Sequence, residues 1–180
     1  MKPKKYVIVY LIKGKAGKYN QKLIKIVGPK FNELHIVKNP RPPHITLKSP
    51  FEATKIKDVE NILKEFVKKQ KSVKININGF GNFRRFVAFL KVNFSKEAKK
   101  IQKNLIKELK NIKWMKFHEH DLKWKPHATI AYGSNKKNFN RIWDYLIKLN
   151  KPKFDLKFDN ITLLIKKGNT WKVYKEFRIK

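Results

Sequence analysis

Two four-residue segments carry the residue types best suited to chemistry. His44-Ile45-Thr46-Leu47 and His127-Ala128-Thr129-Ile130 each place a histidine and a threonine at alternate positions, and each directly follows a proline. Successive side chains of a β-strand point to opposite faces, so the histidine and threonine of each copy share one face and the two apolar residues share the other. The spacing therefore predicts two half-buried strands that each present one His–Thr pair.

A pair of histidines suits acid–base cleavage of a phosphodiester. The ordinary imidazole pKa is about 6.5, so one histidine can take a proton from the nucleophile while the other protonates the leaving oxygen. Thr46 and Thr129 can donate hydrogen bonds to the non-bridging phosphoryl oxygens. Two copies in matched contexts favour a catalytic pair over ordinary sheet residues. The near-identical motifs do not indicate which histidine, His44 or His127, is the base.

The elements that position these segments follow from the hydrophobic pattern. Besides the two motif strands, extended segments are expected at 5–13, 34–37, 72–80, 84–94, 154–166 and 171–179. Helices are expected at 19–31, 58–70, 95–112 and 137–149, with Asp58 and Ser95 as capping residues. Gly81-Asn82 and Gly168-Asn169 are predicted to be the turns of two hairpins.

The order of these elements repeats along the chain. Each half has a His-x-Thr strand, then a helix, then a hairpin, which indicates an internal duplication of pattern rather than of sequence. Two similar α+β lobes would bring the two motif strands together around a cleft. The sequence has no low-complexity segment and no obvious linker, so residues 1–180 are expected to form a single domain.

Composition limits the classes of function. The chain of 180 residues has a formal net charge of +32 that is spread along its length. Such a field attracts polyanions such as RNA, although a generally lysine-rich proteome explains it about equally well. The absence of cysteine excludes disulfides, thiolate nucleophiles and cysteine-based zinc sites. No apolar run of about 18 residues is present and 6–12 is too short for a secretory leader, so a cytoplasmic protein is expected.

The paired tetrads resemble those of the 2H phosphoesterases, which include the 2′-5′ RNA ligase-like proteins and the RNA 2′,3′-cyclic phosphodiesterases. The resemblance covers nearly the whole chain: a first strand, PHITLKSPF, PHATIAYG, and a closing hairpin with Gly168 and Trp171. It implies a bilobal, pseudo-two-fold α+β fold with two antiparallel sheets around a central cleft and helices outside. It also implies catalysis without metal or cofactor by His44, Thr46, His127 and Thr129.

One position departs from the family pattern. Many members carry an arginine five residues after the second histidine, whereas this chain has Tyr132. How the phosphate or base is held is therefore open. Tyr132 could stack on a base or donate to phosphate, and Phe51 could line the cleft, although packing is the commoner role for both. Lys48 continues the histidine face of the first strand and could meet a phosphate charge, or be one more solvated lysine.

Other polar groups are weaker candidates. His118-Glu119-His120-Asp121 contains ligand types for zinc, but consecutive residues rarely converge on one ion, so no metal site is expected. Arg84 and Arg85 lie beside an expected turn and are as readily surface charge as RNA contacts. His35 has no partner in the pattern and is expected to be structural or exposed.

The sequence thus predicts a monomeric, metal-independent phosphodiesterase. The expected substrates are RNA or oligonucleotides with a 2′,3′-cyclic phosphate end or a 2′-5′ linkage, which would be hydrolysed or reversibly joined. Two alternatives remain open: a phosphodiesterase for a small cyclic nucleotide, and a non-catalytic RNA-binding module that keeps the cleft as a binding site.

Overall fold

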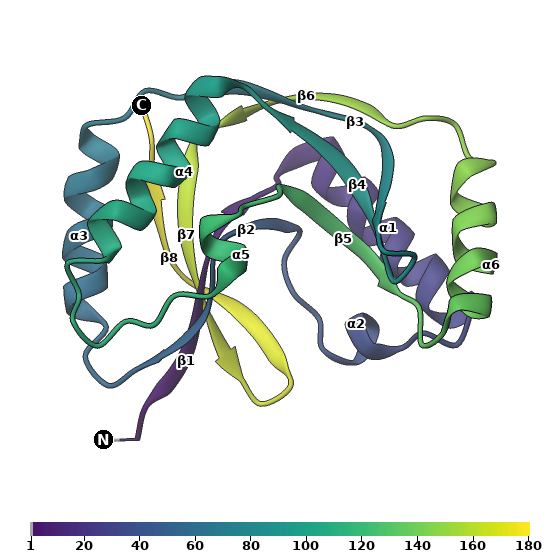
Figure 1. The fold of residues 1–180 in the computed structure, drawn as a ribbon, viewed down its shortest axis with the longest axis horizontal. Coiled ribbons are helices and arrows are strands. Elements are labelled where there is room, and N and C mark those ends of the chain that lie inside the picture. The colour runs from purple at the N-terminus through teal and green to yellow at the C-terminus, as the bar shows by residue number, and fades with distance from the viewer. Residues whose placement is uncertain (1) are drawn as a thin grey trace.

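The computed structural model describes residues 2–180, which contain eight strands and six helices (Figure 1). The strands are β1 (Lys4–Leu11), β2 (His44–Ala53), β3 (Val73–Phe83), β4 (Val87–Phe94), β5 (His127–Tyr132), β6 (Lys153–Phe158), β7 (Asn160–Lys167) and β8 (Thr170–Arg178). The helices are α1 (Gly14–Lys30), α2 (His35–Lys38), α3 (Lys57–Lys68), α4 (Lys96–Leu109), α5 (Glu119–Leu122) and α6 (Lys136–Ile147).

The strands form two four-stranded antiparallel sheets, with the orders β2-β1-β7-β8 and β5-β4-β3-β6. Helices α3 and α4 lie beside the first sheet, and α1 and α6 lie beside the second (Figure 1). The two motif strands, β2 and β5, are edge strands of different sheets and lie in contact with each other. The predicted α+β fold with two antiparallel sheets is confirmed.

Two helices pack on the opposite side of the molecule from the sheet whose strand precedes them. Helix α1 leaves β1 of the first sheet but packs against β5 of the second, whereas α4 leaves β4 of the second sheet and packs against α3. Each of these helices is amphipathic, so its apolar stripe is buried against the sheet it reaches. In α4 that stripe is Ala98, Ile101, Leu105 and Leu109. Ser95 caps the same helix as predicted, because its Oγ accepts a hydrogen bond from the Ala98 amide at 3.2 Å.

Segment 154–166, which was predicted to be one strand, is two strands in different sheets. β6 pairs with β3, and β7 pairs with β1 and β8. Only Asp159 separates them, and its carbonyl accepts a hydrogen bond from the Ile179 amide at 2.8 Å. The two strands differ in burial: β6 alternates along an edge, whereas the first six residues of β7 are buried on both faces. An uninterrupted run of strand-forming residues concealed this change of sheet.

The first hairpin turn also differs from the prediction. Gly81 and Asn82 lie within β3, and the turn is formed by Arg84 and Arg85. Glycine is needed at position 81 for close packing: a Cβ there would lie 2.4 Å from Cε2 of Phe89. The second predicted turn, at Gly168-Asn169, is confirmed between β7 and β8, with a positive φ of 56° at Gly168.

Two smaller expectations are wrong. The segment 34–37, which was expected to be extended, forms most of the short helix α2. Asp58 does not cap α3, since the residue that precedes this helix is Ile56 and no side chain caps it. Residues 2–180 include no helix with the length and apolarity needed to cross a membrane.

Candidate active site

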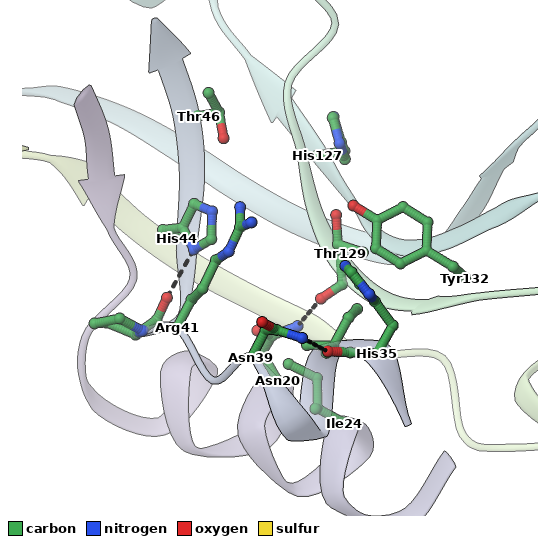
Figure 2. A pocket seen from close by; sticks show the side chains of 12 residues that line it. Asn20, Ile24, His35, Asn39, Arg41, His44, Thr46, His127, Thr129 and Tyr132 are labelled. Atoms are coloured by element: carbon green, nitrogen blue, oxygen red, sulfur yellow. Dashed lines mark hydrogen bonds between the residues drawn. The ribbon is translucent and has the colours of Figure 1, made fainter. Parts of the chain in front are cut away.

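The two His-x-Thr pairs open into one pocket between β2 and β5 (Figure 2). His44 and Thr46 line it from β2, and His127 and Thr129 line it from β5. The pocket has a volume of about 100 Å³. The structure therefore brings together the four residues that the sequence pattern singled out, in the shared space expected of two facing strands.

Both imidazoles are held in the same way. Nδ1 of His44 lies 2.7 Å from the Pro42 carbonyl oxygen, and Nδ1 of His127 lies 2.8 Å from the Lys125 carbonyl oxygen. In each case the acceptor residue directly precedes a proline, which restricts that residue to extended conformations and so fixes the direction of its carbonyl. A neutral imidazole that donates through Nδ1 leaves Nε2 free for the substrate. The prolines before the motifs thus orient the histidines.

The two imidazoles differ in electrostatic surroundings. The pKa of His44 is lowered to about 4, chiefly by burial and also by the nearby Arg41 and His127 charges, which together outweigh the opposing hydrogen bond to Pro42. Burial also lowers the pKa of His127, with a smaller contribution from the His120 charge. Both rings therefore favour the neutral form near pH 7, and Arg41 disfavours the imidazolium specifically at His44.

Arg41 lines the pocket although sequence reasoning did not select it. Its guanidinium lies beside His44 (Figure 2) and 5.1 Å from the centre of the Trp171 ring. The segment that carries it is held by a 3.1 Å hydrogen bond from the Trp171 amide to the Pro40 carbonyl. A planar, permanently charged donor group at this position suits a phosphoryl group. The feature of the sequence that could have indicated Arg41 is its position three residues before the motif histidine, in a segment stiffened by prolines.

Tyr132 lies in the pocket, as expected, and has a partner that was not expected. Its ring meets the ring of His35 edge-on, with the centroids 5.7 Å apart, and both residues line the pocket. In Figure 2 the Tyr132 hydroxyl points into the pocket near Thr129. His35 is exposed, as expected, but α2 also places it at the pocket, which the sequence pattern did not indicate.

Two aromatic rings lie against His127. The Phe83 and Phe89 rings lie 4.8 and 5.3 Å from the His127 ring, and 4.4 Å from each other. Gly81 makes room for Phe89 at this place, as its missing Cβ shows. These rings contribute to the burial that lowers the pKa of His127. Sequence alternation alone did not reveal this contact, since Phe83 and Phe89 belong to the two arms of a hairpin whose turn was misplaced.

Lys48 is not at the site, and the expectation that it meets a phosphate is wrong. A bulge changes the register of β2: Thr46 pairs with Val9 but Lys48 pairs with Ile8, so Leu47 is extra and the alternation of faces breaks. Lys48 is fully buried, with its ammonium 3.0 Å from the Asp121 carboxylate.

Phe51 also lies elsewhere. Its ring packs between those of Tyr6 and Trp114, at centroid distances of 6.1 and 6.2 Å. It lines a separate hollow towards the far end of β2 and does not line the histidine pocket. The expectation that it lines the cleft is therefore wrong, and its ring packs against other aromatic side chains.

The segment His118–Asp121 has a structural role. The Asp121 carboxylate accepts hydrogen bonds from the Ser49 amide at 2.6 Å and the His118 amide at 2.9 Å, besides its ion pair with Lys48. Burial opposes ionisation of Asp121, but these partners outweigh it and lower its pKa. Within residues 2–180, no three histidine or carboxylate side chains are grouped so that they could hold a metal ion.

Side chains from outside the motifs hold the backbone of both strands. The Asn20 amide in α1 donates to the Thr129 carbonyl at 3.2 Å, and the Gln102 amide in α4 donates to the Leu47 carbonyl at 3.0 Å. The Trp124 indole N–H donates to the Thr46 carbonyl at 2.7 Å. Each motif strand is thus tied to a helix that crossed from the opposite sheet, which fixes the two His–Thr pairs relative to each other.

Comparison with known proteins places this site in a family. A family model described as the 2′-5′ RNA ligase superfamily matches residues 34–170. The chain is similar to E. coli LigT complexed with 3′-AMP, at 14% sequence identity over 99% of each chain and a TM-score of 0.62. It is also similar to E. coli LigT complexed with NADP+ (13% identity, 99% of each chain, TM-score 0.60) and to TT0787 of Thermus thermophilus (11% identity, 97% of each chain, TM-score 0.58).

No match was found among curated protein sequences. The structural similarities, at these low identities, establish a shared fold. The family match extends over most of the chain and includes both His-x-Thr segments. The chain therefore belongs to the 2′-5′ RNA ligase superfamily of 2H phosphoesterases.

Proposed function

We propose that this protein is a metal-independent phosphodiesterase that acts on RNA ends carrying a 2′,3′-cyclic phosphate, or on 2′-5′ linkages, by hydrolysis or its reversal. One observation carries the proposal: two imidazoles on facing strands share a pocket, and each has Nδ1 engaged by a carbonyl two residues earlier. Two free Nε2 atoms in one small pocket are what in-line displacement at phosphorus requires of a base and an acid.

The surroundings favour His44 as the base and His127 as the acid. When the pocket holds one proton, the Arg41 charge disfavours its placement on His44, so His127 carries it. Nε2 of His44 then takes a proton from water as the water oxygen bonds to phosphorus. The bond from phosphorus to the leaving ribose oxygen breaks, and Nε2 of His127 gives that oxygen its proton. In the reverse direction the same two groups exchange roles.

The remaining pocket groups suit the phosphoryl oxygens. Thr46 and Thr129 each present a hydroxyl on the histidine face of their strands, and Arg41 supplies a fixed positive charge. Donors and charges that are already in place when negative charge develops lower the barrier without further reorganisation. Arg41 thereby provides a charge that the family pattern often places where this chain has Tyr132.

The small pocket favours a second candidate, a phosphodiesterase for small cyclic nucleotides. A volume of about 100 Å³ holds a phosphate and little more, whereas sites that enclose a whole ligand commonly span about 300–1,000 Å³. A small nucleotide would therefore be gripped mainly at its phosphate. RNA remains the preferred substrate because of the family and because the net charge of +32 favours a polyanion.

Turnover of an RNA oligonucleotide ending in a 2′,3′-cyclic phosphate, measured in EDTA, tests the proposal. Wild type should open the ring, and the position of the remaining phosphate identifies the leaving oxygen. His44→Ala and His127→Ala should each lower kcat by about 10³-fold while folding normally by circular dichroism. His118→Asn is the matched control, because it removes an exposed imidazole yet keeps a side chain that can cap α5. Wild-type turnover in either active-site variant would refute the two-histidine mechanism.

A further inference from the structure

The tip of the β3–β4 hairpin has an unusual turn. Arg84 and Arg85 occupy its two central positions with φ of 48° and 53°, and the Phe86 amide closes it with a 2.8 Å hydrogen bond to the Phe83 carbonyl. Positive φ at both central positions is the pattern of a type I′ turn, in which Asn-Gly is strongly preferred. An arginine has a Cβ that crowds the backbone in this region, so the turn keeps two residues that its backbone disfavours.

The other hairpin shows that the chain uses suitable turn residues elsewhere. The β7–β8 turn has Gly168 at its positive φ, followed by Asn169. Sparsely populated backbone conformations cluster at functional sites, where side chains are kept for a role that outweighs the local cost. The Arg84-Arg85 pair is therefore a candidate for such a role, and it comprises two of the five arginines in the sequence.

The turn is fastened to the candidate active site on both sides. The Phe83 ring, just before it, lies 4.8 Å from the His127 ring. The Phe86 ring, just after it, lies 6.4 Å from the Tyr132 ring, and the Phe86 carbonyl accepts a 2.8 Å hydrogen bond from the Gly133 amide. Figure 1 shows the hairpin tip beside the end of β5. The tip thus lies directly beside His127 and Tyr132, which line the pocket.

The side chains at the tip are free to meet a ligand. Arg84 and Arg85 are exposed, and neither forms an ion pair with a carboxylate of residues 2–180. Phe86 exposes 50% of its surface, which is unusual for an aromatic side chain. Two guanidiniums and an exposed flat ring at adjacent positions match the combination used for single-stranded nucleic acids, in which phosphates pair with arginine and a base stacks on an aromatic ring.

We infer that the Arg84–Phe86 tip binds the nucleotide next to the reacting end of an RNA strand. This inference rests on the proposed function and specifies its substrate, an RNA chain instead of a mononucleotide. The terminal phosphate fills the small pocket between the histidines, so the rest of the chain must lie outside the pocket. Beside the pocket, Arg84 and Arg85 pair with the phosphate of the nucleotide next to the reacting end, and the Phe86 ring stacks on the base of that nucleotide.

The double variant Arg84→Asn/Arg85→Gly separates this role from a structural one. It installs the residues that the turn prefers, so the melting temperature should rise. If the two arginines served only the structure of the turn, this variant would show no loss of selectivity for RNA. We expect kcat/KM for an oligonucleotide with a 2′,3′-cyclic end, relative to that for a 2′,3′-cyclic mononucleotide, to fall about tenfold. The dependence of oligonucleotide affinity on salt should also become shallower by about one to two units of slope. An unchanged ratio would overturn the inference.

Phe86→Leu tests the stacking part, because leucine keeps an apolar side chain but offers no flat ring. The same ratio should fall by about fivefold to tenfold. The control, Arg178→Asn/Lys180→Gly, removes the same charge at the C-terminal end of the chain and should leave the ratio at its wild-type value. An equal fall in this control would assign the loss to net charge and overturn the inference.

Failure of the proposed function would be recognised separately. If the wild type turns over neither substrate, affinity for the unreactive oligonucleotide with a 3′-hydroxyl end is compared between wild type and the two tip variants. Weaker binding by both variants supports the RNA contact without the reaction, and unchanged binding overturns it.

Discussion

The two His-x-Thr strands carry the same motif in different surroundings. Both follow a proline, and both hold Nδ1 of the histidine on a carbonyl two residues earlier. His44, however, lies beside the Arg41 guanidinium, whereas His127 lies against the Phe83 and Phe89 rings. Burial is the main cause of the lowered pKa at both histidines, but the first site adds repulsion from the Arg41 charge, and the second is packed against two aromatic rings. The proposed division of the duplicated motif into base and acid thus rests on neighbours that are not duplicated.

The strands also differ beyond the motif. After Thr46, β2 enters a bulge and continues into the buried ion pair of Lys48 with Asp121. After Thr129, β5 ends at Tyr132, which remains in the pocket. The first strand is therefore anchored by buried contacts directly after its motif, whereas the second continues to line the pocket from its motif to Tyr132. The variants below test this division of roles.

The sharpest test of the division uses a leaving group that needs no proton. His44→Ala and His127→Ala should each lower kcat for a 2′,3′-cyclic phosphate by about 10³-fold. On a nucleoside 4-nitrophenyl phosphodiester, His127→Ala should recover most of its loss, because nitrophenolate leaves unprotonated. His44→Ala should recover little, since water must still be deprotonated. The reverse pattern of recovery would exchange the two roles.

Arg41 should have the next largest effect. Arg41→Gln removes a charge that we expect to stabilise the phosphoryl oxygens, and kcat/KM should fall about 100-fold. Arg41→Lys keeps the charge but loses the planar fork, so an intermediate loss is expected. Steady-state kinetics on the cyclic phosphate measures both. If Arg41→Gln kept wild-type kcat/KM, the guanidinium would have no part in the reaction.

The pH profile of kcat/KM should be a bell whose maximum lies on the acidic side of pH 6.5. His44 must be neutral to act as base, so the rate rises with pH through its pKa of about 4. His127 must be protonated to act as acid, so the rate falls as pH rises through its pKa, which burial holds below 6.5. A profile that still climbs above pH 6.5 would contradict these assignments.

Two substitutions should move the limbs of this bell separately. Arg41→Gln removes the positive charge beside His44, raises the pKa of that imidazole and shifts only the acidic limb to higher pH. Phe89→Leu admits water around His127, raises its pKa towards the ordinary value and shifts only the alkaline limb upward.

Lys48→Met should affect stability much more than chemistry. It leaves the Asp121 carboxylate buried without its cation, and the free energy of unfolding should fall by about 3–5 kcal/mol. Adding Asp121→Asn, which removes the buried charge but keeps a hydrogen-bond acceptor, should restore part of the lost stability. Urea unfolding measures the change, and kcat of the folded fraction should stay close to wild type. Lys68→Met, in an exposed pair with Glu65, is the control and should cost under about 1 kcal/mol.

Sequence patterning predicted the parts of the fold in which each element obeys its own period. The helices α3, α4 and α6 and the strand β1 lie close to the predicted ranges, because their apolar faces follow one repeat from end to end. Prediction from the sequence pattern failed where tertiary packing interrupts a repeat. The β2 bulge places Lys48 in the interior, and the chain passes from one sheet to the other at Asp159. Gly81 lies inside a strand, where it leaves room for the Phe89 ring, and does not form a turn.

The same distinction applies to the site. His44, Thr46, His127 and Thr129 could be selected from sequence because a strand fixes which side chains share a face, and the motif occurs twice. Arg41 and His35 could not, because they precede the first motif in a proline-rich segment and a short helix, where no repeat predicts side-chain direction.

By itself, the sequence determined two proline-led His-x-Thr strands and an alternation of helices and hairpins that suits two sheets. Those properties depend on local rules of strand and helix geometry, which act over a few residues. Only the tertiary structure decided that one pocket contains both imidazoles, that Arg41 lies beside one and two phenylalanines lie beside the other, and that Lys48 is buried. Electrostatic and desolvation effects depend on distances between residues far apart in the chain, and these distances are set only when the two sheets pack together.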